Sequence, residues 1–188
     1  MTTEKYIKLG RITAISSFLI GTAIFLIYFF TSVDVLLFVG YAFIFLAFLI
    51  NLGILGAILL KAKKETENKE NRKKLLITSA IMLLNIPIML FYCWITTILL
   101  NTMRITFKNE TQTILTNINI IGCGGGHIDK LDIGESKTVW VDITDDCSIN
   151  IGFLSNGQKK EENIMGYVTN HMGQKINHNI GGKNEGKL

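Results

Sequence analysis

Residues 120–130, with the sequence IIGCGGGHIDK, place a thiol, three consecutive glycines and an imidazole side by side. This combination of residue types is compatible with three kinds of chemistry. A glycine-rich turn can cradle a phosphate, a Cys and a His four residues apart can bind a metal ion, and a thiol can pair with a second thiol. The compartment and the elements on either side decide among them.

A phosphate site is the weakest of these interpretations. A dinucleotide-binding fingerprint needs G-x-G-x-x-G between a strand and a helix. Gly122 and Gly124 fit that spacing, but His127 occupies the last glycine position and no helical pattern follows. No Lys-Ser or Lys-Thr pair follows these glycines directly, as a P-loop requires. Phosphate binding at this stretch is therefore not predicted.

The second thiol of the region is Cys147, and residues 104–188 contain no other cysteine besides Cys123. In an oxidising compartment such a pair is most simply a disulfide. The loop it closes, about 25 residues, corresponds to roughly 3–4 kcal/mol of stabilisation in the chain-entropy model. We therefore predict a Cys123–Cys147 disulfide, with residues 124–126 as a turn beside it that is free to adopt positive φ.

A metal site is the sharper alternative. It would use Cys123, His127 and Cys147, completed by one of four further donors: His171, His178, Met165 or Met172. Thiolate and thioether ligands favour copper(I) or zinc. Because neither CxxC nor HxxxH occurs, the spacing supports the metal less than it supports the disulfide. Because we favour the disulfide between Cys123 and Cys147, we predict no cofactor.

Nucleophilic catalysis finds no support in the sequence. Ser136 lies in GES, whereas a nucleophile elbow needs G-x-S-x-G after a strand. Asp145 and Asp146 in TDDC are typical of a turn. We do not expect an enzyme.

Three long apolar runs precede this region, at residues 12–30, 35–60 and 75–103. A bilayer core of about 30 Å needs about 20 helical residues. The first run exceeds the apolar core of a signal peptide, and no A-x-A-like site follows it. The runs therefore predict a membrane anchor of three transmembrane helices over residues 1–103.

Basic residues predict the orientation of these helices. The N-terminal flank carries Lys5, Lys8 and Arg11, and the connection at 61–74 carries seven more Lys or Arg residues, whereas the connection near 31–34 carries none. Short cytoplasmic segments are enriched in Lys and Arg. We expect a cytoplasmic N-terminus and basic loop 61–74, and an exported, periplasmic or extracellular, C-terminal part. Arg104 and Lys108 oppose this weakly.

The pI of about 8.9 does not indicate nucleic-acid binding. From residue 102 onward the chain carries nine basic and ten acidic side chains. The positive charge lies instead on the flank and the loop, where it can set topology and attract anionic lipid by about 1 kcal/mol per side chain. The predicted partner is the lipid bilayer of a plasma or bacterial inner membrane.

The predicted spans contain no ionisable residue, and their polar residues are typical of helix packing. Asn51 and Asn85 can bond across helices, and Gly53 with Ala57 forms a small-xxx-small pair for close approach inside the bundle or in a homo-oligomer. Pro87 should kink the third span. Such helices suit an anchor better than a transporter, although an accessory subunit of a transporter or channel remains an alternative.

From residue 104 the pattern changes to short β-branched and aromatic segments of period two, separated by turn residues. The SNGQ stretch at 155–158 favours a type I′ hairpin turn. About seven such segments predict a small antiparallel β-sandwich of immunoglobulin-like size over 104–180, followed by a disordered tail at 181–188. Trp140, Phe153 and Tyr167 are expected in its core.

The fold class predicted is thus membrane α plus all-β, an architecture that resembles small bacterial inner-membrane proteins with a few anchoring helices and one exported β domain. The function expected first is that of a membrane-anchored interaction protein that presents its sandwich to a protein or envelope partner. The alternative is an exported metal-binding or redox-sensing domain.

Overall fold

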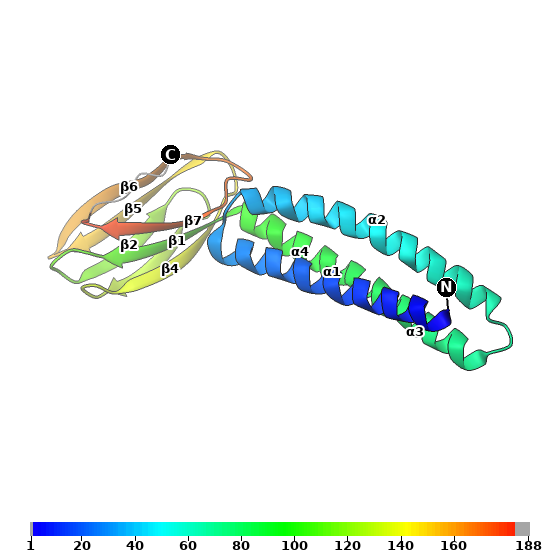
Figure 1. Cartoon of the computed structure of the whole chain (residues 1–188). Helices are drawn as coiled ribbons and strands as arrows, with labels where there is room; N and C mark the ends of the chain where they lie inside the picture. The colour runs from blue at the N-terminus through cyan, green and yellow to red at the C-terminus, as the bar shows by residue number, and fades with distance from the viewer. Residues whose placement is uncertain (1, 183–188) are drawn as a thin grey trace. The chain divides into compact units, whose positions relative to one another are not determined.

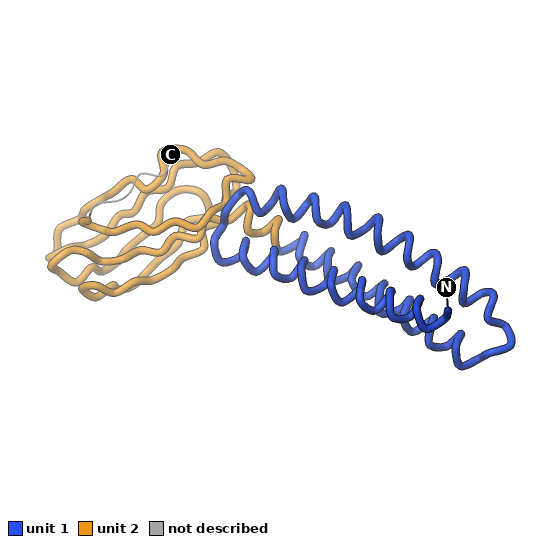
Figure 2. The backbone as a smooth tube through the Cα atoms, viewed as in Figure 1, with its two compact units in different colours: residues 1–95 blue, residues 96–188 orange. Residues whose placement is uncertain are grey.

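The computed structural model describes residues 2–182, and the chain divides into two compact units (Figure 2). The helical unit is residues 1–95 and the β unit is residues 96–188. The predicted disordered tail lies, from residue 183 on, outside the described residues.

The helical unit contains four helices labelled in Figure 1: α1 (Thr3–Thr31), α2 (Val35–Lys64), α3 (Lys69–Leu83) and α4 (Asn85–Leu100), the last of which ends in the β unit. Together α3 and α4 form the third of three stretches that are long and apolar enough to cross a membrane. The expectation of three long apolar helices is confirmed.

The connection at residues 61–74 differs from the predicted loop. It is mostly helical, because α2 runs to Lys64 and α3 begins at Lys69. Lys and Glu are good helix formers. Ion pairs at i,i+4 spacing, Lys61–Glu65 at 2.7 Å and Lys74–Glu70 at 2.6 Å, add to this. Only residues 65–68 lie between the two helices.

Pro87 stands three residues after the interruption between α3 and α4 at Leu84. Proline has no backbone N–H, so the carbonyl of residue 83 receives no bond from it. This is the physical reason for expecting a break here.

A glycine that sequence reasoning did not single out lies where three helices meet. A Cβ on Gly10 of α1 would stand 2.5 Å from Ile58 of α2 and 2.7 Å from Thr78 of α3. Gly53, by contrast, has nothing within 4 Å of an added Cβ. Gly53 therefore sets no helix contact within the helical unit, and a role of Gly53 and Ala57 in a homo-oligomer stays a prediction.

The two asparagines make the cross-helix bonds that their positions suggested. Asn51 of α2 donates to the hydroxyl of Ser17 on α1 at 2.9 Å. Asn85 of α4 donates to the carbonyl oxygen of Ala14 on α1, also at 2.9 Å. Both bonds join polar groups inside an otherwise apolar unit, where an unpaired amide is costly.

The β unit contains seven strands among the described residues: β1 (Thr102–Asn109), β2 (Leu115–Ile121), β3 (Gly126–Leu131), β4 (Ser136–Asp142), β5 (Cys147–Ser155), β6 (Gln158–Val168) and β7 (Lys175–Ile180). They form a three-stranded sheet of order β4-β1-β7 and a four-stranded sheet of order β3-β2-β5-β6. The elements can be followed in Figure 1.

The expectation of purely antiparallel pairing is wrong for one strand pair. The four-stranded sheet is antiparallel throughout, but β7 runs parallel to β1, with Ile105 opposite Ile176, so the three-stranded sheet is mixed. Period-two alternation shows which side chains share a face and carries no information about strand direction. The direction follows from how the chain passes from one sheet to the other after β6.

The core of the β unit draws side chains from both sheets. Met103, Ile105 and Phe107 come from β1 of the three-stranded sheet, and Ile149, Ile151 and Phe153 come from β5 of the four-stranded sheet. Each set alternates with residues on the opposite face, as a half-buried strand requires.

The hairpin between β5 and β6 confirms the prediction for SNGQ. Asn156 and Gly157 have φ of 52° and 77°, and Ser155 pairs with Gln158. A type I′ turn requires positive φ at both central residues, a conformation that Asn and Gly tolerate.

Candidate interaction surface of the β unit

The stretch that combines thiol, glycines and imidazole forms the connection from β2 into β3. We call residues 122–126 the glycine corner. Cys123 in this corner and Cys147 at the start of β5 lie at disulfide-bonding distance, with their Cα atoms 5.4 Å apart. The pair therefore ties the corner to the neighbouring strand of the same sheet, as the spacing of the two thiols predicted.

The glycines of the corner are required by close packing and by backbone conformation. An added Cβ on Gly122, whose φ is 99°, would overlap the carbonyl oxygen of Ser148. One on Gly124 would stand 3.0 Å from the carbonyl oxygen of Asp142, and one on Gly126 3.0 Å from Val139. At Gly122, only glycine avoids both the strain of positive φ and the overlap, whereas a Cβ at Gly124 or Gly126 would require the neighbouring atoms to shift by a few tenths of an ångström.

Two amide groups of the corner donate hydrogen bonds within the protein. Gly124 donates to the carbonyl oxygen of Asp142 at 2.7 Å, and Gly125 donates to that of Gly122 at 3.0 Å. An anion-binding turn needs such N–H groups to point at the ligand. The corner is thus a packed turn that links β4 to β5 through its backbone and its thiol.

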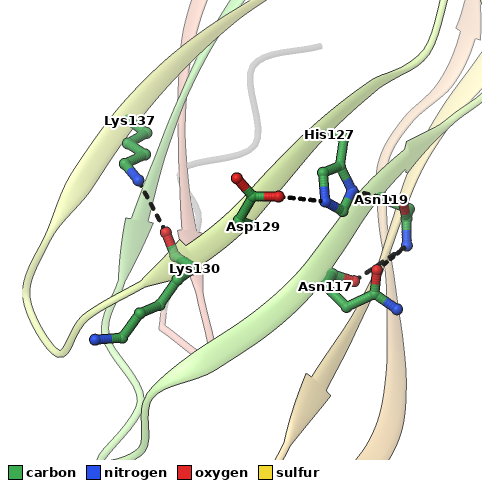
Figure 3. Close-up of polar contacts among 6 residues, drawn as sticks. All are labelled: Asn117, Asn119, His127, Asp129, Lys130 and Lys137. Carbon is green, nitrogen blue, oxygen red and sulfur yellow. Dashed lines mark hydrogen bonds and ion pairs between the residues drawn. The ribbon is translucent and has the colours of Figure 1, made fainter.

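His127 lies just beyond the corner on β3, and its ring is held by side chains of two strands (Figure 3). Nδ1 lies 2.8 Å from Oδ1 of Asn119 on β2, and Nε2 lies 3.0 Å from Oδ1 of Asp129 on β3. Asn119 in turn donates its amide to the carbonyl and side-chain oxygens of Asn117, at 3.1 and 3.2 Å. We call Asn117, Asn119, His127 and Asp129 the polar row.

The hydrogen-bond roles within the polar row are constrained. Because Asn119 gives its amide nitrogen to Asn117, its oxygen faces the imidazole, and the second ring nitrogen faces a carboxylate oxygen. Both ring nitrogens therefore lie beside side-chain oxygen atoms of the polar row. The row is exposed to solvent, with Asp129 97% exposed, so it fixes orientation more than it adds stability.

The structure does not gather the residues of the metal alternative into one site. His127 is engaged with Asn119 and Asp129, while Cys123 and Cys147 lie together. Across residues 2–182, no three His, Cys, Asp or Glu side chains come close enough together to hold a metal ion.

A lysine links the edges of the two sheets beside the polar row. Nζ of Lys137 on β4 donates to the carbonyl oxygen of Lys130 on β3 at 3.0 Å (Figure 3). The ammonium of Lys130 is itself paired with Asp132 at 2.8 Å, and its hydrogen bond to that carboxylate raises the pKa of Lys130. Lysines on edge strands discourage the addition of a further strand.

The other edges of the two sheets are joined by His178, which the sequence offered as a possible further metal donor. His178 of β7 is only 5% exposed, and its Nε2 lies 2.9 Å from Oε2 of Glu162 on β6. The other carboxylate oxygen of Glu162 accepts the N–H of Gly181 at 3.2 Å. The sequence contained a signal for this burial. His178 lies two residues from both Ile176 and Ile180, so the three side chains share one face of the strand.

Two of the three aromatic residues expected in the core lie outside it. Phe153 is buried, but Trp140 is 49% exposed and Tyr167 is 57% exposed. Arg104 on β1 lies opposite Trp140 on β4, with its guanidinium carbon 5.7 Å from the ring centroid. The cation–π contact covers part of the indole, which explains how a tryptophan is accommodated on the outer face of a sheet.

Comparison with known proteins assigns no family to this chain. No protein-family model matches it, and the search of curated proteins yields no match. Among solved structures, an NMR structure of a protein from Eubacterium rectale matches 41% of this chain and 74% of its own length, at 15% identity and a TM-score of 0.34. A likeness at that level carries no argument about fold or function.

Proposed function

We propose that this protein is a membrane-anchored interaction protein. Its three apolar helices span a membrane with the N-terminus and the basic connection in the cytoplasm. The two sheets of the β unit pack as a sandwich on the far side of the membrane and present their outer face to a protein or another component of the envelope.

The observation that carries this proposal is the exposure of the helical unit. Each candidate span contains an 18-residue window of high hydropathy. Only 11%, 6% and 22% of these windows, in chain order, is buried inside the protein. Large side chains such as Phe38, Phe45 and Trp94 are exposed there. Soluble proteins rarely expose an apolar patch of more than a few hundred Å², so such a surface needs lipid around it.

Two independent features support the proposed sidedness. The basic residues lie in the first turns of α1 and around residues 61–74, as cytoplasmic segments require. The paired cysteines lie in the β unit, and disulfides persist in oxidising compartments outside the cytoplasm. Three crossings between the N-terminus and β1 make these two features consistent with each other.

The polar row supports interaction through a sheet face. Its donors and acceptors are held by one another on two adjacent strands, so a partner would meet groups that are already oriented. Lys137 occupies an edge carbonyl on β3, which disfavours recognition by strand addition there. An accessory role for the helices in a larger channel has no observation in its favour beyond their length.

Membrane sidedness is tested by thiol labelling of intact cells in a Cys93→Ala background. An impermeant maleimide should label Cys123 and Cys147 only after treatment with a reductant. Labelling that requires cell lysis would place the β unit in the cytoplasm and contradict the proposal. Labelling without reductant, enhanced by a chelator, would favour the metal alternative instead.

The interaction surface is tested by a photo-crosslinking amino acid at position 129 of the full chain in intact cells. A matched control carries it at position 138, an exposed position on β4 of the other sheet. We expect a discrete adduct from position 129 that is lost when His127 is also replaced by Ala, and none from position 138. Equal adducts at both positions, or none at either, would contradict the assignment of this surface.

A further inference from the structure

A shallow groove of about 490 Å³, wide open to solvent and lined by α3 alone, lies along one side of this helix. Its lining residues are spaced three and four apart and form one stripe of the helix: Lys69, Arg72, Lys73, Leu76, Ile77 and Ala80. The opposite side of α3, with Leu75, Thr78, Ser79 and Met82, is buried. The stripe therefore faces away from the helix packing.

The first half of this stripe is cationic. Two neighbouring lysines outside the stripe are neutralised, Lys61 by Glu65 and Lys74 by Glu70. The carboxylate of Glu70 is thus occupied by Lys74, whose Nζ lies 2.6 Å from Oε1. Within residues 2–182, Lys69, Arg72 and Lys73 form no ion pair, so the groove retains three positive charges.

The second half of the stripe is apolar. Leu76 and Ile77 are exposed, and Ala80 adds little bulk. At about 1.5 Å per residue, the step from Lys73 to Ala80 covers about 10 Å along the helix. The groove thus changes from charged to apolar within a few ångströms, between Lys73 and Leu76.

We infer that this groove binds an anionic phospholipid of the cytoplasmic leaflet. The phosphate is held by Lys69, Arg72 and Lys73, and an acyl chain lies along Leu76, Ile77 and Ala80. A guanidinium recognises phosphate through paired N–H donors, and the lysines add point charges. The inference rests on the membrane-anchored part of the proposed function and adds a lipid class and its binding residues.

Two features favour a lipid over a free phosphate ion and over diffuse attraction. A free ion would gain nothing from the apolar half of the groove, whereas a phospholipid contacts both halves. Basic pockets on the cytoplasmic side of spans are a recognised mode of anionic-lipid binding. Here the charges and the apolar floor share one stripe of one helix, which gives the lipid a defined orientation.

The test uses the full chain in mild detergent and native mass spectrometry with added phosphatidylglycerol or phosphatidylcholine. The wild-type chain should prefer phosphatidylglycerol. The groove variant K69Q/R72Q/K73Q should lose this preference by at least about tenfold. The control K5Q/K63Q/K64Q removes the same charge from exposed positions on the same side and should change the preference less than about twofold.

Equal losses in the two triple variants would mean diffuse surface attraction and would overturn the inference. A second pair of variants tests the apolar half: Ala80→Trp should weaken phosphatidylglycerol binding, and Leu60→Trp on α2 should not. Displacement of the lipid by millimolar inorganic phosphate would assign the site to a free anion and would also overturn it.

Alkaline carbonate extraction of membranes separates this inference from the proposed function. Release of the wild-type chain by carbonate would overturn the membrane anchor and the lipid site together. Retention in the membrane without any preference for phosphatidylglycerol would overturn the lipid site alone.

Discussion

The helical unit and the β unit bury their apolar residues in opposite ways. The core of the helical unit consists of five buried residues, Ala14, Ile58, Ala62, Leu75 and Met82, and most of its large apolar side chains are exposed. The core of the β unit contains fifteen buried residues from both sheets, while its outer surface carries charged and amide side chains. The two units thus differ in whether their large apolar side chains lie inside the unit or on its surface.

This contrast also explains where each unit keeps its polar groups. In the helical unit, the side-chain amides of Asn51 and Asn85 donate hydrogen bonds to α1, because an amide left unpaired in an apolar unit is costly. In the β unit, the polar row lies on the surface, whereas the buried His178 and Asn109 bond across from one sheet to the other. Polar residues of the β unit therefore serve both at the surface and in the packing of the two sheets.

The largest expected effect comes from replacing a phenylalanine by alanine in each unit, which tests the difference in burial between them. Phe107→Ala removes a fully buried side chain from the β core and should lower the free energy of unfolding of that unit by about 3–5 kcal/mol. Phe45→Ala, at a side chain 67% exposed on α2, should change helical stability by less than about 1 kcal/mol. Hydrogen exchange of the full chain in detergent reports each unit separately. If the two substitutions lowered the stability of their units by similar amounts, the side chain of Phe45 would have to be packed against protein.

The disulfide should matter to the β unit alone. Replacing Cys123 and Cys147 by Ser opens a loop whose ends are 24 residues apart, which should cost the β unit about 3 kcal/mol. Cys93→Ser in the helical unit is the matched control and should leave the β unit unchanged. Chemical denaturation, monitored by hydrogen exchange, measures the stability of the β unit in the double variant and in Cys93→Ser. An unchanged β unit in the double variant would show that the glycine corner is held by its backbone bonds alone.

A large side chain should disrupt helix packing at Gly10 but not at Gly53. Gly10→Leu forces a side chain against Ile58 and Thr78 and should destabilise the helical unit by about 1–3 kcal/mol. Gly53→Leu meets open space and should be tolerated. Thermal unfolding in detergent distinguishes the two variants. If Gly53→Leu is the damaging one and also abolishes a dimer in crosslinking, that glycine acts between copies of the chain.

The smallest expected effect concerns an exposed ion pair of the β unit. The hydrogen bond and charge of Lys159 lower the pKa of Glu161, whose carboxylate lies 2.9 Å away. A carboxyl pKa that is lower in the folded state stabilises the fold above the pKa of the unfolded carboxyl and ceases to do so as pH falls through the folded value. Lys159→Met should raise the pKa of Glu161 toward its ordinary value without a measurable change in unfolding midpoint. An NMR titration of Glu161 checks this, and a clear drop in midpoint would show that the pair is more than a solvated contact.

The elements that were predicted well are those with strong local signals. Uninterrupted apolar runs indicated the three long helices, period-two segments indicated the strands, and Asn156–Gly157 indicated a type I′ turn. The pairing of Cys123 with Cys147 followed from there being two thiols in one region. Each of these inferences needs only residues that are close in sequence or few in number.

The parts that were missed depend on residues brought together from a distance. Gly10 lies at a helix crossing because of where Ile58 and Thr78 fall, and nothing near Gly10 reveals this. The exposure of Trp140 depends on which face β4 turns outward and on Arg104 beside it. In the polar row, Asn119 meets His127 through the register of β2 and β3.

By itself, the sequence determined that this chain combines long apolar helices with a thiol-containing β region, because hydrophobic length and periodicity are local properties of the chain. Only the tertiary structure decided that β7 runs parallel to β1, that the glycines form a packed corner, and that His178 meets Glu162. The reason is physical: strand direction, steric contact and ion pairing are set by residues that are distant in sequence and meet only when the chain has folded.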